Sequence, residues 1–198
     1  MPSAQLEELR STILSSPLLY PILREWEKLE LPDCWLTAGS IAQTVWNRTF
    51  ALPPTHGISD IDIVYFDPSD LSERAEAQHT ARILDAFARL PVRIDLKNEA
   101  RVHLWYEAKF GYPITPYTSS ADSITTFPTT ATAIGLQPHP NGLRVNAPYG
   151  IDDLMSSIVR PNKKQITHEI YEAKTKRWIA LWPKLRIVDW DVEDRRKP

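Results

Sequence analysis

Apolar positions recur along this chain with two different spacings, and the spacing separates expected helices from expected strands. A period of three to four residues marks the apolar face of a helix, whereas alternation marks a strand with one buried face. The pattern and its breaks predict helices over residues 6–14, 18–29, 41–49, 70–90, 99–110, 121–126 and 166–181. Alternating or short apolar runs predict strands over residues 33–38, 60–66, 92–97, 131–136 and 143–147.

The order of these elements indicates an α/β (α+β) fold in which helices flank a small mixed β-sheet. An Asn-Gly pair within residues 138–142 favours a hairpin turn between the last two strands. No internal repeat or low-complexity linker interrupts the sequence. We therefore expect one domain over residues 1–198, with a core over residues 30–100 and a C-terminal extension over residues 101–190 packed on it.

Composition narrows the class of protein. The chain is 42% hydrophobic and contains seven tryptophans, which fits a sizeable buried core. It has no long uncharged apolar run and no basic-then-apolar leader, so we expect neither a membrane span nor a signal peptide. Cys34 is the one cysteine and cannot form an internal disulfide, which fits a cytoplasmic location.

Charge is distributed unevenly along the chain. The formal net charge of −2 argues against a generally basic nucleic-acid binder. Residues 160–198, however, carry 11 Lys and Arg against 6 Asp and Glu, a net charge of +5 that leaves −7 for residues 1–159. The C-terminal part could supply cations to a phosphate-bearing ligand, and a solvated helix face with a charged tail explains the same pattern.

Three carboxylates lie at the polar phase of two expected strands. Asp60 and Asp62 are two residues apart and leave the same face, and Asp95 lies on the next expected strand. Adjacent carboxylates repel one another unless a cation lies between them, and such hard oxygen ligands suit Mg²⁺ or Mn²⁺. A pair of this kind also commonly caps the turn at a strand end. Gly39 and Ser40 precede them in the turn before a helix that Ser40 is able to cap.

The Gly39-Ser40 turn, the Asp60-x-Asp62 pair and Asp95 together resemble the nucleotidyltransferase superfamily typified by polymerase beta. Segments 39–46, 60–67 and 160–162 are also similar to a bacterial nucleotidyltransferase-like family within it. The resemblance spans most of the chain and implies a polymerase-beta-like nucleotidyltransferase fold.

The resemblance also implies roles for individual residues. Asp60 and Asp62 would bridge two Mg²⁺ or Mn²⁺ ions, and Asp95 would complete the ion that binds the acceptor hydroxyl. Gly39 would let the backbone approach the phosphates, and the Ser40 hydroxyl and the helix N-terminal amides would bind them.

Further candidates come from the residues alone. Arg160 and Lys163 could contact the triphosphate or the acceptor, and a solvated loop is the simpler interpretation. Trp105, Tyr112 and Tyr117 could stack on a base, although aromatic side chains at such positions are more often core.

These observations predict a metal-dependent nucleotidyltransferase, which moves a nucleoside monophosphate from a nucleoside triphosphate (NTP) to a hydroxyl acceptor. A small molecule or a protein is favoured as acceptor over nucleic acid because the net charge is modest and no RNA-binding module is evident. The alternative is a non-catalytic nucleotide- or metal-binding protein that retains the fold. No membrane partner is expected.

Overall fold

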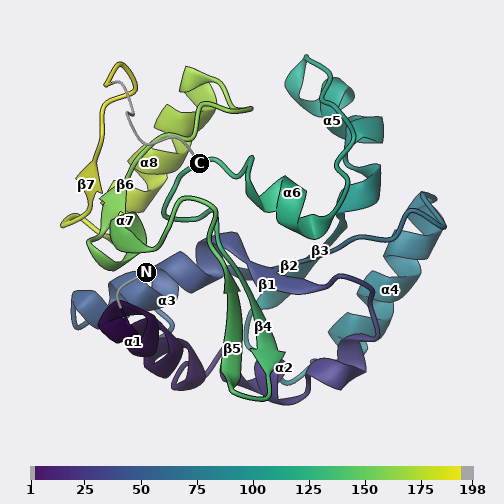
Figure 1. Cartoon of the computed structure of the whole chain (residues 1–198), viewed down its shortest axis with the longest axis horizontal. Helices are drawn as coiled ribbons and strands as arrows, with labels where there is room; N and C mark the ends of the chain where they lie inside the picture. The colour runs from purple at the N-terminus through teal and green to yellow at the C-terminus, as the bar shows by residue number, and fades with distance from the viewer. Residues whose placement is uncertain (1–2, 193–198) are drawn as a thin grey trace.

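The computed structural model describes residues 3–192, and a five-stranded mixed sheet lies at its centre (Figure 1). Its strands are β1 (Trp35–Thr37), β2 (Asp60–Tyr65), β3 (Arg93–Asn98), β4 (Gly135–His139) and β5 (Gly142–Asn146). The strand order is β3-β2-β1-β4-β5, in which β2 and β3 are parallel and the other neighbours antiparallel. The expected mixed α+β class is confirmed.

Helices flank this sheet. They are α1 (Ser3–Leu14), α2 (Tyr20–Arg24), α3 (Ala38–Thr49), α4 (Glu73–Ala86), α5 (His103–Phe110), α6 (Ser120–Ile124), α7 (Asp152–Met155) and α8 (His168–Leu181). Two 3₁₀ helices, η1 (Trp26–Leu29) and η2 (Glu99–Arg101), and a second small sheet of β6 (Ile158–Val159) and β7 (Arg186–Ile187) complete the described elements. In Figure 1, α8 and α5 lie at the upper left and upper right, above the sheet, with α6 between them.

The short strand β1 is the middle of the sheet. All three of its residues are buried, and Leu36 pairs with Ile63 of β2 on one side and Leu136 of β4 on the other. A strand between two neighbours is buried on both faces, which explains why Thr37 is buried together with the apolar Trp35 and Leu36. Residues 135–146 of the expected extension therefore contribute two strands to the same sheet as the expected core.

Several expected boundaries differ from the structure. The helix expected over residues 18–29 is divided into α2 and η1, because Glu25 leaves helical geometry between them. Residues 131–134 lie outside the strand: 131 and 132 form a turn, and backbone N–H groups of this segment donate to the carbonyls of Thr129 and Thr132. These local hydrogen bonds take the place of the interstrand hydrogen bonds that the largely apolar segment 131–134 predicts.

Ser40 does not cap its helix. Helix α3 begins at Ala38, so Ser40 lies inside the first turn, where it is buried and its Oγ donates to the Thr37 carbonyl over 3.4 Å. Ala38 takes a left-handed backbone conformation with φ of 60°, and the helix begins there, three residues earlier than expected.

The end of helix α8 packs against α3 and against the loop before β2. Trp182 packs edge-on against Trp46 and donates from Nε1 to Asn47 Oδ1 over 2.7 Å. Gly57 has φ of +68°, and a Cβ there would come within 2.5 Å of the Trp182 ring. Only glycine suits this position, because both the backbone conformation and the close approach exclude a side chain. This contact fixes α8 above the carboxyl-bearing strands.

Candidate functional site

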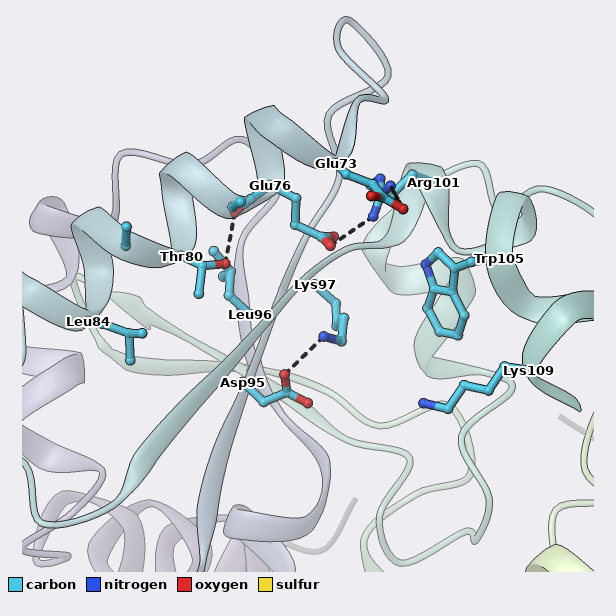
Figure 2. Close-up of a pocket in the computed structure, with 12 residues that line it drawn as sticks. Glu73, Glu76, Thr80, Leu84, Asp95, Leu96, Lys97, Arg101, Trp105 and Lys109 are labelled. Carbon is cyan, nitrogen blue, oxygen red and sulfur yellow. Dashed lines mark hydrogen bonds and ion pairs between the residues drawn. The ribbon is translucent and has the colours of Figure 1, made fainter.

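A cavity of about 510 Å³ lies where β2 and β3 face helices α5 and α8. The β1–α3 turn and the segment around Phe127 and Pro128 complete its lining. Three of its lining residues, Asp95, Lys97 and Lys109, are among those drawn in Figure 2. Strands and helices that are far apart in the sequence therefore meet at one concave site.

Three carboxylates form one side of the cavity, which we call the acidic wall: Asp60, Asp62 and Asp95. Asp60 and Asp62 alternate with the buried Ile61 on β2, and parallel pairing places Asp95 directly beside Asp62. Alternation therefore aims all three carboxylates toward the same face of the sheet.

The electrostatics of Asp62 reflect this crowding. Burial and, to a lesser extent, the neighbouring charges of Asp60 and Asp95 raise the pKa of its carboxyl to about 6. Lys174 and a backbone hydrogen bond from Gly39 act in the opposite direction. The site thus holds a carboxylate whose ionised form would be stabilised by an added cation.

Cationic side chains of the same sheet already partner the outer carboxylates. Lys97 Nζ donates to Asp95 Oδ1 over 3.0 Å, as Figure 2 shows. Arg93 lies 3.7 Å from Asp60 Oδ2, and the Ser59 hydroxyl donates to Asp60 Oδ1. Both ion pairs are partly exposed, so each contributes little to stability.

Three cations on helices face the acidic wall, and we call them the basic wall: Lys109, Lys174 and Arg177. Lys174 and Arg177 are three residues apart and share a face of α8, and Lys109 comes from the last turn of α5. Burial lowers the pKa of Lys174, as does repulsion from Arg177 and Lys109, whereas Asp62 and Asp60 raise it. The two walls thus present opposite charges to each other across one cavity.

Sequence reasoning did not single out the basic wall. Two sequence features could have pointed to Lys174 and Arg177: the net charge of +5 in the C-terminal part, and the 3.6-residue helical period, which places residues three apart on one face. Lys109 carried no such signal, because its neighbourhood in the sequence is of mixed charge.

Two buried polar atoms at the cavity have no hydrogen-bond partner among the described residues. They are Gln43 Oε1, on α3, and Trp178 Nε1, on α8. An unpaired acceptor on one helix and an unpaired donor on another are groups that a bound ligand could satisfy. Glu99 also lines the cavity, and burial raises the pKa of its carboxyl to about 8.

The donor set bears directly on a bound metal ion. The carboxylates of the acidic wall supply oxygen ligands on one face of the sheet, and they repel one another most at Asp62. Oxygen ligands of this kind are the ones that Mg²⁺ or Mn²⁺ requires. Within residues 3–192, however, no three Asp, Glu, His or Cys side chains lie close enough together to hold an ion. The acidic wall therefore offers oxygen ligands of a suitable kind, but its three carboxylates do not converge on one ion position in this arrangement, in which Asp95 is paired with Lys97 and Asp60 with Arg93.

The structure places the other expected site residues apart from one another. Gly39 lines the cavity, whereas Ser40 is buried behind it with its hydroxyl turned to the backbone. Arg160 Nε donates to Asp153 Oδ2 over 3.1 Å, and Lys163 lies over the Trp190 ring. Neither Arg160 nor Lys163 lines this cavity.

The aromatic candidates also separate. Tyr112 and Tyr117 line a different cavity, where both hydroxyls hydrogen-bond to Gln165. Trp105 lines a further cavity, beside β3 and α4, which adjoins the acidic wall at Asp95 and is described below as the second cavity.

Comparisons with known proteins agree with this geometry. The profile of a family described as nucleotidyltransferase matches residues 24–187. A solved NMR structure described as a CCA-adding enzyme head domain has 27% sequence identity and a TM-score of 0.75, over 92% of this chain and 95% of that chain. No curated protein matches the sequence.

More distant structures are also similar over one part of their length. The Thermotoga maritima CCA-adding enzyme in complex with tRNA has 12% identity and a TM-score of 0.47, over 96% of this chain and 40% of that chain. A CCA-adding enzyme in complex with CTP has 15% identity and a TM-score of 0.46, over 96% and 41%.

One expectation concerned membranes. None of the helices described in residues 3–192 combines the length and the apolar character that a bilayer crossing requires.

Proposed function

This chain belongs to the nucleotidyltransferase family, and on that premise we propose that it is a metal-dependent enzyme. It moves a nucleoside monophosphate from an NTP to a hydroxyl acceptor. Family membership supports nucleotidyl transfer in general; the metal requirement and the acceptor are our proposal.

One observation carries the proposal: an acidic wall and a basic wall face each other across a single cavity. Asp62 and Lys174 influence each other's pKa in opposite directions, which indicates that the two walls are electrostatically coupled. A polyphosphate bound with divalent cations fits between such walls, because it presents both negative oxygens and positive ions.

The residues of the site would divide the work as follows. Lys174, Arg177 and Lys109 bind the phosphate oxygens of the NTP and orient it. Asp60, Asp62 and Asp95 would hold Mg²⁺ or Mn²⁺, which would neutralise charge on the attacking and leaving oxygens. Phe127 and Trp178 line the same cavity and limit the access of water.

The acceptor is proposed from chemistry and from the neighbours. The similar solved structure is described as a CCA-adding enzyme head domain, so an RNA end is one candidate. The formal net charge of −2 is not typical of a protein that binds a polyanion over an extended surface, and this favours a small molecule or a protein as acceptor.

A second candidate function has its own observation. The Ser40 hydroxyl is turned away from the cavity, and Asp95 is bonded to Lys97 where a metal ion would otherwise be held. A protein that binds nucleotide without transferring it, and acts through a partner, would tolerate both features.

The experiment that tests the proposal is calorimetric titration of the four ribonucleoside triphosphates in Mg²⁺ and in Mn²⁺, with pyrophosphate release followed in the same samples. Wild type should bind at least one NTP only when the metal is present. The double variant Asp60→Ala/Asp62→Ala should lose this binding, and Asp85→Ala, an exposed carboxylate of α4 outside the cavity, should retain it.

The outcomes separate the two functions. Metal-dependent binding with pyrophosphate release in the presence of an acceptor supports the transferase. Metal-dependent binding without release under every acceptor tried favours the binding protein. Wild type that binds no NTP in either metal would contradict both.

A further inference from the structure

A second cavity of about 540 Å³ adjoins the first at the third carboxylate (Figure 2). The two cavities share Asp95, Lys97 and Lys109. A molecule in the second cavity would therefore reach the acidic wall from the side opposite to the β1–α3 turn. This is where the acceptor of the proposed transfer could enter, so the inference rests on the proposed function.

The second cavity is elongated along helix α4. Its α4 residues share one face of the helix, at positions 73, 76, 77, 80, 81 and 84. These eleven steps span about 17 Å at about 1.5 Å per residue. An extended peptide covers that length with about five residues. Figure 2 shows α4 along one border of the groove and α5, with Trp105 and Lys109, at one end.

The opposite border is the free edge of the sheet. Strand β3 is the terminal strand and pairs only with β2 among the described strands. The Asn98 backbone N–H already turns outward, where it donates to Glu76 Oε2 over 2.7 Å. Because backbone groups alternate sides along a strand, Ile94 and Leu96 present their N–H and C=O groups on that same edge. Such an edge is a template for another strand.

The charges that line this groove indicate which kind of molecule fits it. Three acidic side chains of the groove are balanced by three basic ones: Glu73, Glu76 and Asp95 against Lys97, Arg101 and Lys109. Arg101 is itself buried and bonded to Glu76 over 2.9 Å, so it is not available to a phosphate backbone. The exposed Leu84 and the Trp105 ring add apolar surface. A balanced, partly apolar groove suits a polypeptide better than a polyanionic RNA.

We propose that this groove binds an extended peptide segment of a partner protein as an added strand on β3, and that a Ser or Thr hydroxyl of that segment is the nucleotidyl acceptor. The geometry follows from strand pairing. The peptide residue beside Asp95 would point its side chain to the same face of the sheet. Its Cβ would lie about 5 Å from that of Asp95, which places a short hydroxyl side chain next to the acidic wall.

The transfer balances without a further reactant. The Ser or Thr oxygen forms a bond to the α-phosphorus of the NTP, the bond from that phosphorus to the bridging oxygen breaks, and pyrophosphate leaves. The hydroxyl proton passes to water. No oxidant or reductant is involved.

The test uses the full chain with Mg²⁺, the four α-³²P-labelled NTPs and a degenerate nine-residue peptide library with Ser fixed at its centre. A matched library with Ala at the centre is the control. We expect label on the Ser library only. We also expect slower amide hydrogen exchange at Ile94 and Leu96 in the presence of either library, because strand addition occupies these groups without requiring chemistry.

Two variants localise the effect. Ala81→Trp fills the groove from an exposed position of α4, and Ala86→Trp makes the same change on α4 outside the groove. Ala81→Trp should lower peptide labelling at least tenfold and remove the exchange protection, with NTP affinity unchanged. Ala86→Trp should leave all three measurements as in wild type.

The contrary results are distinct. NTP binding with label on an RNA 3′ end or on a small polyol, and none on Ser peptides, would overturn the inference while the proposed function stands. Peptide labelling that Ala81→Trp leaves unchanged would also overturn it. Absence of NTP binding by wild type would overturn the proposed function, and the inference with it.

Discussion

The acidic and basic walls of the cavity differ in how far local sequence determines them. Asp60, Asp62 and Asp95 lie on two neighbouring strands whose alternation and register fix where each carboxylate points. Lys174 and Arg177 lie on a helix that reaches the cavity through its tertiary packing. Its Trp178 packs edge-on against Trp46, and the indole of Trp182 at its end donates to Asn47. One wall is thus a property of the strands, and the other a property of the assembled fold.

The difference explains why sequence reasoning found one wall alone. A strand with period two has only two faces, so a pair of polar residues at i and i+2 must share one. A helix can turn any of its faces toward the sheet, and tertiary contacts decide which. Positively charged ligands for phosphate are therefore harder to identify in a single sequence than carboxylates for metal.

The largest expected effect is that of Asp62→Asn. Removing one charge from the centre of the acidic wall should weaken metal-dependent NTP binding at least 100-fold in calorimetry. In metal-free buffer the same variant should be more stable above pH 6, by on the order of 1 kcal/mol, because the raised pKa of Asp62 means that its ionised form is disfavoured in the fold. A variant that binds NTP as wild type does would remove Asp62 from the site.

A smaller effect is expected from the basic wall. Lys174→Met should weaken NTP binding about tenfold, as the loss of one charge-assisted phosphate contact of about 1.4 kcal/mol would give. Lys176→Met, an exposed cation of α8 outside the cavity, is the matched control and should have no effect. Equal loss in both variants would mean that only the overall charge of α8 matters, and the comparison of two walls would fail.

Glu99 is a fourth acidic side chain of the cavity, and its protonation state decides whether it belongs to the acidic wall. Burial raises its pKa to about 8, with Glu76 and Asp62 adding to the rise while Ser123 and Lys97 oppose it. Its stabilising, protonated form is fully present below the unfolded pKa near 4.5 and is lost as the pH rises through 8.

Urea unfolding between pH 5 and 8 measures this directly. The wild-type free energy of unfolding should fall by roughly 1 kcal/mol per pH unit over that range through this residue, and Glu99→Gln should lack this contribution. If the two pH profiles run parallel, Glu99 is ionised at neutral pH and belongs to the acidic wall.

The smallest expected effect concerns a residue that the sequence put forward for nucleotide binding. Lys163 lies over the Trp190 ring and away from the cavity lining, so Lys163→Met should change NTP affinity by less than a factor of two. Calorimetry on this variant beside Lys174→Met compares the sequence-based choice with the structure-based one. A tenfold loss from Lys163→Met would restore it to the nucleotide site.

Much of the fold was predictable because its signals are local. Alternation predicted strands over residues 60–66 and 92–97, and β2 and β3 agree with these limits to within one residue. The Asn-Gly turn predicted the β4–β5 hairpin. The left-handed Ala38 was not predictable, since its conformation depends on packing at the β1–α3 junction and not on its side chain.

The same limit applies to the candidate site. The carboxylates were chosen from spacing that a strand preserves, whereas Ser40 was chosen as a cap whose role depends on where the helix begins. A shift of that start to Ala38 moved its hydroxyl inside the first turn. Whether the chosen residues bind metal and nucleotide stays a prediction for the experiments above.

The position of β1 at the centre of the sheet has a consequence for synthesis of the chain. Its two neighbours come from residues 60–65 and 135–139, so a nascent chain completes the sheet only after β5 has emerged. Lys174 follows Asp95 by 79 positions, which takes roughly 4 to 16 s at about 5–20 residues per second. For that interval the acidic wall has Lys97, Arg93 and Lys109 within reach, and it gains the two remaining cations of the basic wall only when α8 docks.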